Sequence, residues 1–184
     1  MTNNDSKDVM NQETIGTYSI VLMPDDAKVW VYQSNRELSE QEVADIENAG
    51  NSFINSWAAH GASLKASFDV IYNRFVVIAV DEHQAMASGC SIDSSVRFVK
   101  QLEQQFNLNL FDRLQVAYIY NGEIKVCHLN NLLNELTSVL GKDKNVLGEV
   151  IVFNNMVLTK AEFDEQWEIP LKYSWQSRIL TDLK

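Results

Sequence analysis

Residues 67–80 read SFDVIYNRFVVIAV, and this stretch decides the fold. In residues 67–72 Phe, Val and Tyr alternate with Ser, Asp and Ile, whereas residues 75–80 are apolar throughout. Alternation is typical of a half-buried strand, and a short apolar run bounded by turn residues is typical of a strand buried on both faces. We therefore predict a hairpin through Asn73-Arg74, with an edge-like first strand and a fully buried second strand.

In the sequence, one helix is expected before this hairpin and one after it. Ser39-Glu40-Gln41-Glu42 has the spacing of a capping box, so a helix should begin there. We expect Gly50 to weaken the middle of this helix and His60-Gly61 to end it. A second helix should open within the segment 90–95, because the apolar residues that follow it recur at helical spacing.

The remaining elements continue this alternation. Asn121-Gly122 is a pair preferred in type I′ turns, so residues 114–128 should form another hairpin. Further strands are expected at 18–23, 28–33 and 149–154, and the first two should form a hairpin or two consecutive strands. A leucine-rich helix over 129–140 should end at Gly141, a short helix should begin from Thr159, and an aromatic tail should follow from Pro170. This order predicts an α+β fold, with a largely antiparallel sheet and about four helices packed on it.

The length and composition favour one folded unit. The chain has 184 residues, of which 46% are hydrophobic, and this is enough to bury a sizeable core. Residues 1–14 are rich in Asn, Asp, Gln and Ser without periodicity, so we expect a disordered tail there. Residues 15–184 should then form a single α+β domain.

The charge balance limits the partners. Lys and Arg number 15 against 25 for Asp and Glu, which gives a formal net charge of −10. Such a field repels phosphate groups, so neither nucleic acid nor a membrane is an expected partner. The two cysteines are far apart, the first residues lack an apolar leader, and no window approaches the roughly 20 apolar residues of a membrane span. We expect a soluble, cytoplasmic protein that binds another protein or a small molecule.

The segment 89–95 combines a cysteine, an aspartate and three hydroxyl groups where a buried strand should give way to a helix. Backbone amides at a helix start stabilise negative charge, so Cys90 is a candidate nucleophile that reacts as thiolate. His60 could serve as its base, and Asp93 could orient that base. The structural alternative is that Cys90 is a packed residue, Ser91 or Asp93 caps the helix, and His60 ends the preceding one.

Two weaker patterns involve carboxylates. Asp112, Glu123 and Lys125 have the acidic and lysine composition of metal-dependent nucleases, in which carboxylates hold Mg²⁺ and the lysine positions a water molecule. The acidic net charge argues against a DNA substrate. Asp81-Glu82, at the end of the apolar run, is as typical of a solvated strand end as of a functional site.

Motifs for metals and cofactors are missing from the sequence. His60, His83 and Cys90 include no closely spaced pair of the kind that zinc sites usually show. The chain has no Walker A pattern, no GxGxxG for a dinucleotide and no GxSxG nucleophile elbow. We therefore expect no cofactor and no metal ion, and no ATP hydrolysis of the P-loop type.

Large aromatic residues gather near the end of the chain. Trp167, Tyr173 and Trp175 surround Pro170, and such residues outside regular structure can anchor an interface. Alternatively, the tail folds back over the sheet and covers its core.

Several stretches carry a resemblance to a known family: VWVYQSNR at 29–36, FINSW at 53–57 with HG at 60–61, GCSID at 89–93, FDR at 111–113, FNN at 153–155, and SW at 174–175 with SR at 177–178. Together they resemble a family of short bacterial proteins labelled "ABC transporter ATPase", over nearly all of the chain beyond the tail. The label implies a P-loop ATPase, but the Walker A pattern is missing, so we expect the name to be a misannotation. The resemblance supplies no catalytic residues.

The leading expectation is a non-catalytic binding or interaction domain. The alternative is a cysteine-dependent enzyme that uses Cys90, His60 and Asp93.

Overall fold

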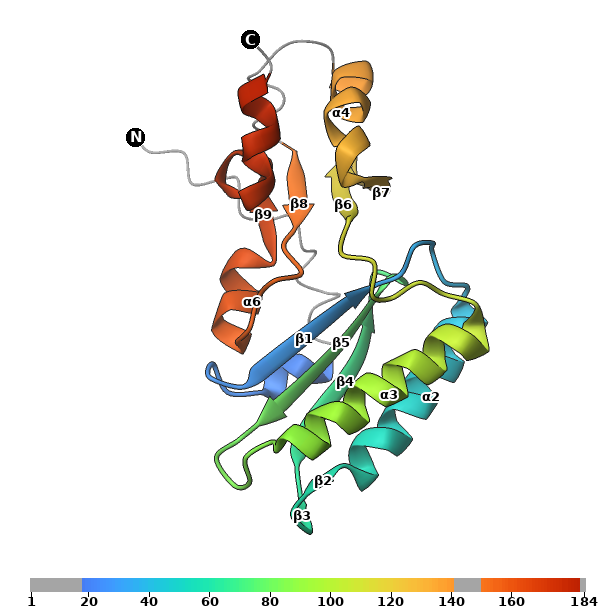
Figure 1. The fold of residues 1–184 in the computed structure, drawn as a ribbon, viewed down its shortest axis with the longest axis vertical. Coiled ribbons are helices and arrows are strands. Elements are labelled where there is room, and N and C mark those ends of the chain that lie inside the picture. Colours follow the sequence, from blue (N-terminus) through green and yellow to red (C-terminus); the bar gives the residue numbers. More distant parts are fainter. Residues whose placement is uncertain (1–17, 141–149, 183–184) are drawn as a thin grey trace.

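The computed structural model describes residues 18–140 and 150–182, so the predicted tail at 1–14 lies outside the described part (Figure 1). The described part contains four α-helices and three antiparallel sheets. This confirms the predicted α+β fold with about four helices. The strands are divided between a three-stranded sheet, a four-stranded sheet and a small two-stranded hairpin.

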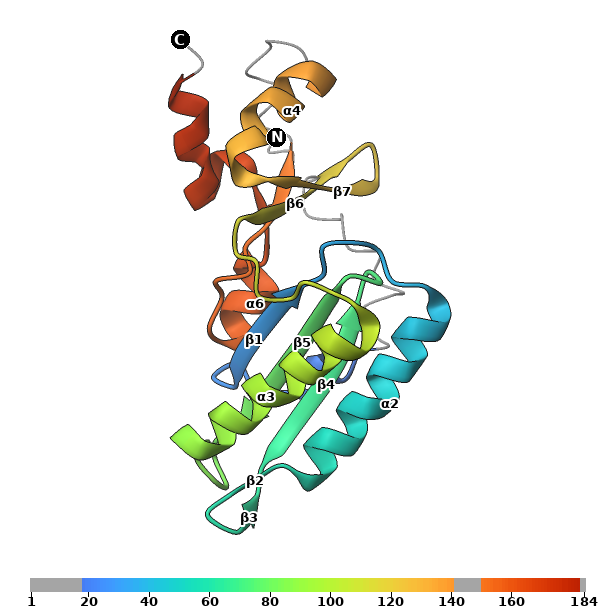
Figure 2. The same ribbon diagram turned by 45° about the vertical axis from the view of Figure 1, so that its right-hand side comes forward.

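The predicted central hairpin is confirmed. It consists of β4 (Lys65–Ile71) and β5 (Phe75–Asp81), and β5 lies between β4 and β1 (Lys28–Gln33) in the three-stranded sheet. Every residue of β5 is buried, because both faces of the sheet are covered. On one face lie α2 (Glu40–Ser56) and α3 (Gly89–Phe106), as Figure 2 shows.

The capping box at the start of α2 is also confirmed. The Ser39 hydroxyl accepts a hydrogen bond from the Glu42 backbone N–H, and the Glu42 carboxylate accepts one from the Ser39 N–H. Gly50 has a different role from the one expected. A Cβ atom at this position would lie 2.1 Å from a ring carbon of Phe68 on β4, so the glycine lets helix and strand pack closely.

The prediction that His60-Gly61 ends this helix is wrong. The helix ends at Ser56, and the Trp57 N–H bonds to the Ile54 carbonyl. His60 and Gly61, with φ values of 52° and 83°, instead form the turn between β2 (Ala58–Ala59) and β3 (Ala62–Ser63). A Gly beside a residue that adopts positive φ serves a tight hairpin turn as well as a helix end.

The predicted strand at 18–23 is likewise wrong, and with it the expected first hairpin. Residues Ser19–Leu22 form a 3₁₀ helix, η1, which packs on β4 and β5. The buried carboxylate of Asp69 causes this, because it accepts hydrogen bonds from the Ser19 N–H at 2.6 Å and the Ile20 N–H at 2.9 Å. Ile20 is thereby buried beneath the sheet.

The second half of the chain builds the four-stranded sheet, in the order β7-β6-β8-β9. The predicted turn at Asn121-Gly122 is confirmed, with φ values of 52° and 79° between β6 (Gln115–Tyr120) and β7 (Glu123–His128). The strand expected at 149–154 is the shorter β8 (Ile151–Phe153), and β9 (Glu168–Pro170) pairs with it.

Short helices complete this half. They are η2 (Leu129–Asn131), α4 (Leu132–Leu140), α6 (Lys160–Gln166), η3 (Leu171–Tyr173) and η4 (Trp175–Asp182). The Thr159 hydroxyl caps α6, as predicted, by accepting from the Glu162 N–H. The expected helix end at Gly141 lies outside the described residues.

The two halves share a hydrophobic core. Phe153, Phe163 and Trp167 of the second half pack with Val29 and Phe75 of the three-stranded sheet. Main-chain hydrogen bonds join the two halves as well, because the Lys160 N–H donates to the Ala27 carbonyl at 2.9 Å. Within the described ranges, no helix combines the length and the apolar character needed to cross a membrane.

Candidate ligand-binding site

A pocket of about 150 Å³ lies where the two halves meet. Its walls come from residues 29–33 of β1, from residues 110–113 after α3 with Gln115 and Val116 of β6, from Phe153 of β8 with the segment 155–158 that follows, and from residues 175–176 at the start of η4. Four segments that are distant in sequence thus converge on one cavity. We refer to it below as the junction pocket.

The edge of β1 supplies main-chain groups to the junction pocket. The Val29 N–H points away from β5 and donates to the Leu158 carbonyl at 2.9 Å, whereas the Ser34 N–H donates to the Arg74 carbonyl on the other side. Successive residues of a strand direct their main-chain groups to opposite sides. The N–H and C=O groups of Val31 and Gln33 therefore also point away from β5, on the side of the pocket.

Aromatic and aliphatic side chains make up most of the lining. Trp30 and Tyr32 come from one face of β1, and Phe111 meets Tyr32 edge to face with ring centroids 5.3 Å apart. At the mouth, Met156 and Trp175 are 54% and 44% exposed, which is high for large apolar side chains. Burial raises the pKa of the Tyr32 phenol, so this group is a neutral hydroxyl at physiological pH.

Two buried glutamines in the lining each have one amide atom without a hydrogen-bond partner in the described part of the chain. Gln33 is 5% exposed and its Nε2 is unpaired in the described part of the chain, and the same is true of Oε1 of Gln176, which is 2% exposed. The other end of the Gln33 amide is held, because its Oε1 accepts from Asn155 Nδ2 at 2.9 Å. Asn155 Oδ1 in turn accepts from Trp167 Nε1 at 3.1 Å. Both atoms are themselves fully buried, as are the unpaired Ser67 Oγ and Arg74 Nε, which lie outside the lining, so they are not open to the space inside the pocket.

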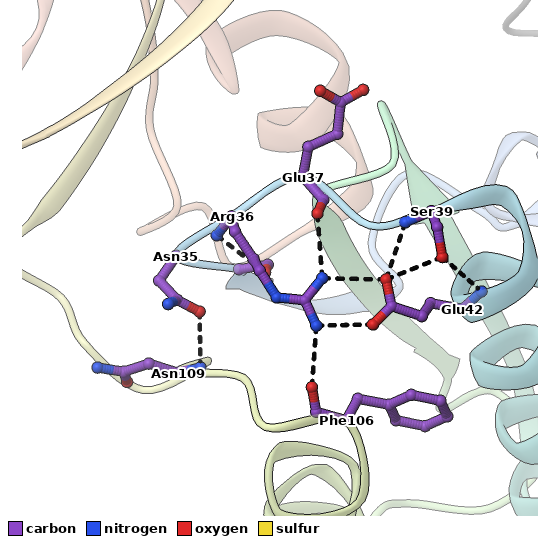
Figure 3. Close-up of polar contacts among 8 residues, drawn as sticks. Asn35, Arg36, Glu37, Ser39, Glu42, Phe106 and Asn109 are labelled. Carbon is purple, nitrogen blue, oxygen red and sulfur yellow. Dashed lines mark hydrogen bonds and ion pairs between the residues drawn. The ribbon is translucent and has the colours of Figure 1, made fainter.

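A polar network fixes the wall formed by the α3–β6 connection (Figure 3). The Arg36 guanidinium donates to both Glu42 carboxylate oxygens, at 3.0 and 2.6 Å, and to the Phe106 carbonyl at 2.9 Å. Asn35 Oδ1 accepts from the Asn109 N–H at 2.9 Å. These hydrogen bonds tie the end of α3 to the loop after β1. They thereby fix the position of the first residues of the segment that carries Phe111.

This ion pair perturbs both of its members. The hydrogen bond from Arg36, aided by those from Ser39, lowers the pKa of Glu42 to about 2. The same hydrogen bond raises the pKa of Arg36. The bidentate geometry is the strong form of an arginine–carboxylate pair, so it fixes the Arg36 guanidinium against the first turn of α2.

The residues predicted to be catalytic lie elsewhere. Cys90, His60 and Asp93 are all exposed, and in the described part of the chain no hydrogen bond joins any two of them. Cys90 is the second residue of α3, whose N-cap is Ser88. The alternative of a packed Cys90 and a cap at Ser91 or Asp93 is therefore wrong. The cysteine-enzyme hypothesis stays a prediction.

The aromatic residues near the end of the chain separate into two groups. Trp167 is 1% exposed and belongs to the core, so it presents no surface to a partner. Tyr173 is 70% exposed, and Trp175 lines the mouth of the junction pocket. The tail both folds over the sheet and leaves two aromatic rings at the surface.

Two of the carboxylates considered for other sites, Asp112 and Asp81, have structural partners. Asp112 accepts from the Leu114 N–H at 3.0 Å and from Gln115 at 3.2 Å, which shapes a turn. Asp81 accepts from the backbone N–H and the ring of His83 and from Lys65, and these hydrogen bonds hold its pKa well below the usual range. No group of three potential metal ligands is found among the described residues.

Sequence reasoning did not select Gln33, Asn155 or Gln176. Glutamine and asparagine have no periodic signature, and their burial becomes visible only in the folded chain. One signal was available, because the stretches 29–36, 111–113 and 153–155, which carry the resemblance described above, all contribute to the lining.

No family model, curated protein or solved structure matches the chain. The resemblance to the family labelled "ABC transporter ATPase" therefore stays a prediction.

Proposed function

We propose that the protein is a non-catalytic binding domain that holds a small, uncharged, largely apolar molecule in the junction pocket. The observation that carries this proposal is a cavity of about 150 Å³ with a mostly apolar lining contributed by segments that are distant in sequence.

The size of the cavity limits the ligand. An engineered apolar cavity of about 150 Å³ in another protein holds one benzene molecule, so the junction pocket fits about one six-membered ring with a small substituent. The net charge of −10 disfavours anions. A neutral ring compound satisfies both limits.

The exposed rim supports the same assignment. Met156, Leu158 and Trp175 line the pocket and are 54%, 66% and 44% exposed. Exposed apolar residues gathered around a cavity commonly mark a binding site. A ligand longer than one ring would extend over this rim.

Binding of toluene tests the proposal, because toluene is a one-ring molecule without polar groups. Two of the four tryptophans, Trp30 and Trp175, line the pocket, so a titration followed by tryptophan fluorescence and by NMR chemical shifts reports on it. Val31→Phe places a larger side chain in the pocket and should abolish binding. Val21→Phe, on the exposed surface of η1, is the matched control and should leave binding unchanged. Equal binding by both variants would contradict the assignment of the site.

A further inference from the structure

We propose that two copies of the chain associate through the outer edge of β7, so that their four-stranded sheets join into one continuous sheet. The pairing is antiparallel, with Ile124 of one copy opposite Ile124 of the other. In the described part of the chain β7 is the last strand of its sheet, and no strand pairs with its outer edge. Figure 2 shows the turn end of the β6–β7 hairpin projecting from the side of the molecule. The lining of the junction pocket includes no residue of β7, so this surface is separate from the proposed ligand site.

The alternation of main-chain hydrogen bonds shows which groups of β7 are directed outward. The Leu129 N–H donates to the Leu114 carbonyl at 2.7 Å, so residue 129 directs its main chain toward β6. Successive residues of a strand direct these groups to opposite sides, so the odd-numbered residues of β7 also face β6. Ile124 and Val126 therefore direct their N–H and C=O groups away from β6, where a further strand can pair with them.

A row of isoleucines crosses the sheet and stops at this edge. Ile151 of β8 lies opposite Ile119 of β6, and Ile119 lies opposite Ile124 of β7. All three residues are half-buried, and side chains in such cross-strand rows stabilise a sheet by packing on one another. A two-fold axis between the Ile124 residues of two copies continues the row into a second, identical row. The edge thus presents an apolar surface that is complementary to itself.

The charged residues on the other face select the same register. Glu123 and Lys125 are two residues apart in β7, so they share a face. With Ile124 opposite Ile124, Glu123 of each copy lies opposite Lys125 of the other, and opposite charges in cross-strand pairs are favourable. A shift by two residues places the two Lys125 side chains opposite each other, which is unfavourable. A lysine on an edge strand commonly prevents pairing with other strands, but in this register a glutamate matches it.

Exchange of the charges tests this register. Glu123→Lys and Lys125→Glu each place like charges at both pairs of the dimer, so each variant should self-associate about tenfold or more weakly than the parent. An equimolar mixture of the two variants has opposite charges at both pairs, so association should return. The control is Glu165→Lys, which makes the same change of charge at an exposed residue of α6 and should self-associate like the parent. Sedimentation velocity over a series of protein concentrations measures all four samples.

Amide hydrogen exchange followed by NMR locates the interface. The N–H groups of Ile124 and Val126 point away from β6, so they should exchange quickly in dilute protein and more slowly in concentrated protein. The Lys125 N–H faces β6 and should be protected equally at both concentrations.

A parent protein that stays monomeric at the highest concentration at which it is soluble overturns the proposal. A dimer that neither charge variant weakens, with both variants shown to be folded by circular dichroism, overturns it as well. Failure of the mixed variants to associate, or equal exchange of the Ile124 and Val126 amides at both concentrations, overturns the assigned edge and register.

Discussion

Replacing Gly50 by alanine should destabilise the protein, although helix propensity alone predicts the opposite. Alanine in a helix interior is favoured over glycine by about 1 kcal/mol. At this position, however, the new Cβ would lie 2.1, 2.3 and 2.4 Å from three ring carbons of Phe68. Ordinary contacts between carbon atoms are about 3.5 to 4.0 Å, so helix or ring must move by about 1.5 Å.

Neither can move freely. Phe68 is 3% exposed and its ring lies edge to face with Phe98 at 5.9 Å between centroids. Overpacking of this kind costs typically about 1 to 3 kcal/mol, and more when the surroundings are rigid. Because both groups are held, we expect an overpacking cost of about 2 to 3 kcal/mol. After the gain of about 1 kcal/mol in helix propensity, the net loss is about 1 to 2 kcal/mol, which for a chain of this length lowers Tm by roughly 2 to 8 °C.

Thermal and urea unfolding followed by circular dichroism measure this effect. Gly89→Ala is the matched control, because no atom lies within 4 Å of its added Cβ, and this variant should be neutral or slightly stabilising. Combining Gly50→Ala with Phe68→Leu should cost less than the sum of the two single changes. A Gly50→Ala variant as stable as the parent would refute the close-packing explanation.

Three further results are expected. Burial raises the pKa of the Cys127 thiol to about 11, so alkylation of the native protein reports on Cys90, and Cys90→Ser is the blank. An apparent pKa of alkylation well below about 8.5 would support the enzyme hypothesis, and a value near 8.5 would count against a thiolate nucleophile. Glu42 has its pKa lowered to about 2 by the hydrogen bond from Arg36, so its contribution to stability is present above about pH 4.5 and is lost as the pH falls toward 2. Glu42→Gln should accordingly be less stable than the parent near neutral pH and approach it in acid, and a pH-independent difference in urea unfolding would contradict this. Trp175→Ala should leave Tm nearly unchanged and weaken toluene binding, whereas a large fall in Tm would place this ring in the core.

Local signals in the sequence predicted most of the regular structure. The capping box before α2, the Asn121-Gly122 turn and the apolar run of β5 each depend on neighbouring residues, and each is confirmed. Predictions were wrong where the conformation depends on residues that are distant in the sequence. The run at 18–23 is β-rich by composition, but the carboxylate of Asp69, some 50 residues away, accepts hydrogen bonds from the Ser19 and Ile20 N–H groups. These hydrogen bonds favour the 3₁₀ helix over a strand.

The candidate site depends on contacts between residues distant in sequence even more than the fold does. Cys90 stood out because a cysteine at a helix start has known chemistry, yet it is exposed, and within the described residues no hydrogen bond joins it to His60 or Asp93. Gln33 is an ordinary residue at the end of a strand in the sequence. In the structure it accepts a hydrogen bond from Asn155, which is 122 residues away. Only tertiary structure brings such a pair together.

The junction pocket also has a consequence for the order of folding. The three-stranded sheet with α2 and α3 is built from residues 28–106, whereas the walls of the pocket include residues 175 and 176 near the other end of the chain. During synthesis the sheet can form early, but the pocket is complete only when η4 has emerged and docked. A ligand at one hundred times its Kd stabilises the protein by about 2.7 kcal/mol, and it does so only for chains that have finished folding. Ligand present in the cell would thus act as a selective stabiliser of fully assembled molecules, and chains interrupted before residue 175 would gain no protection from it.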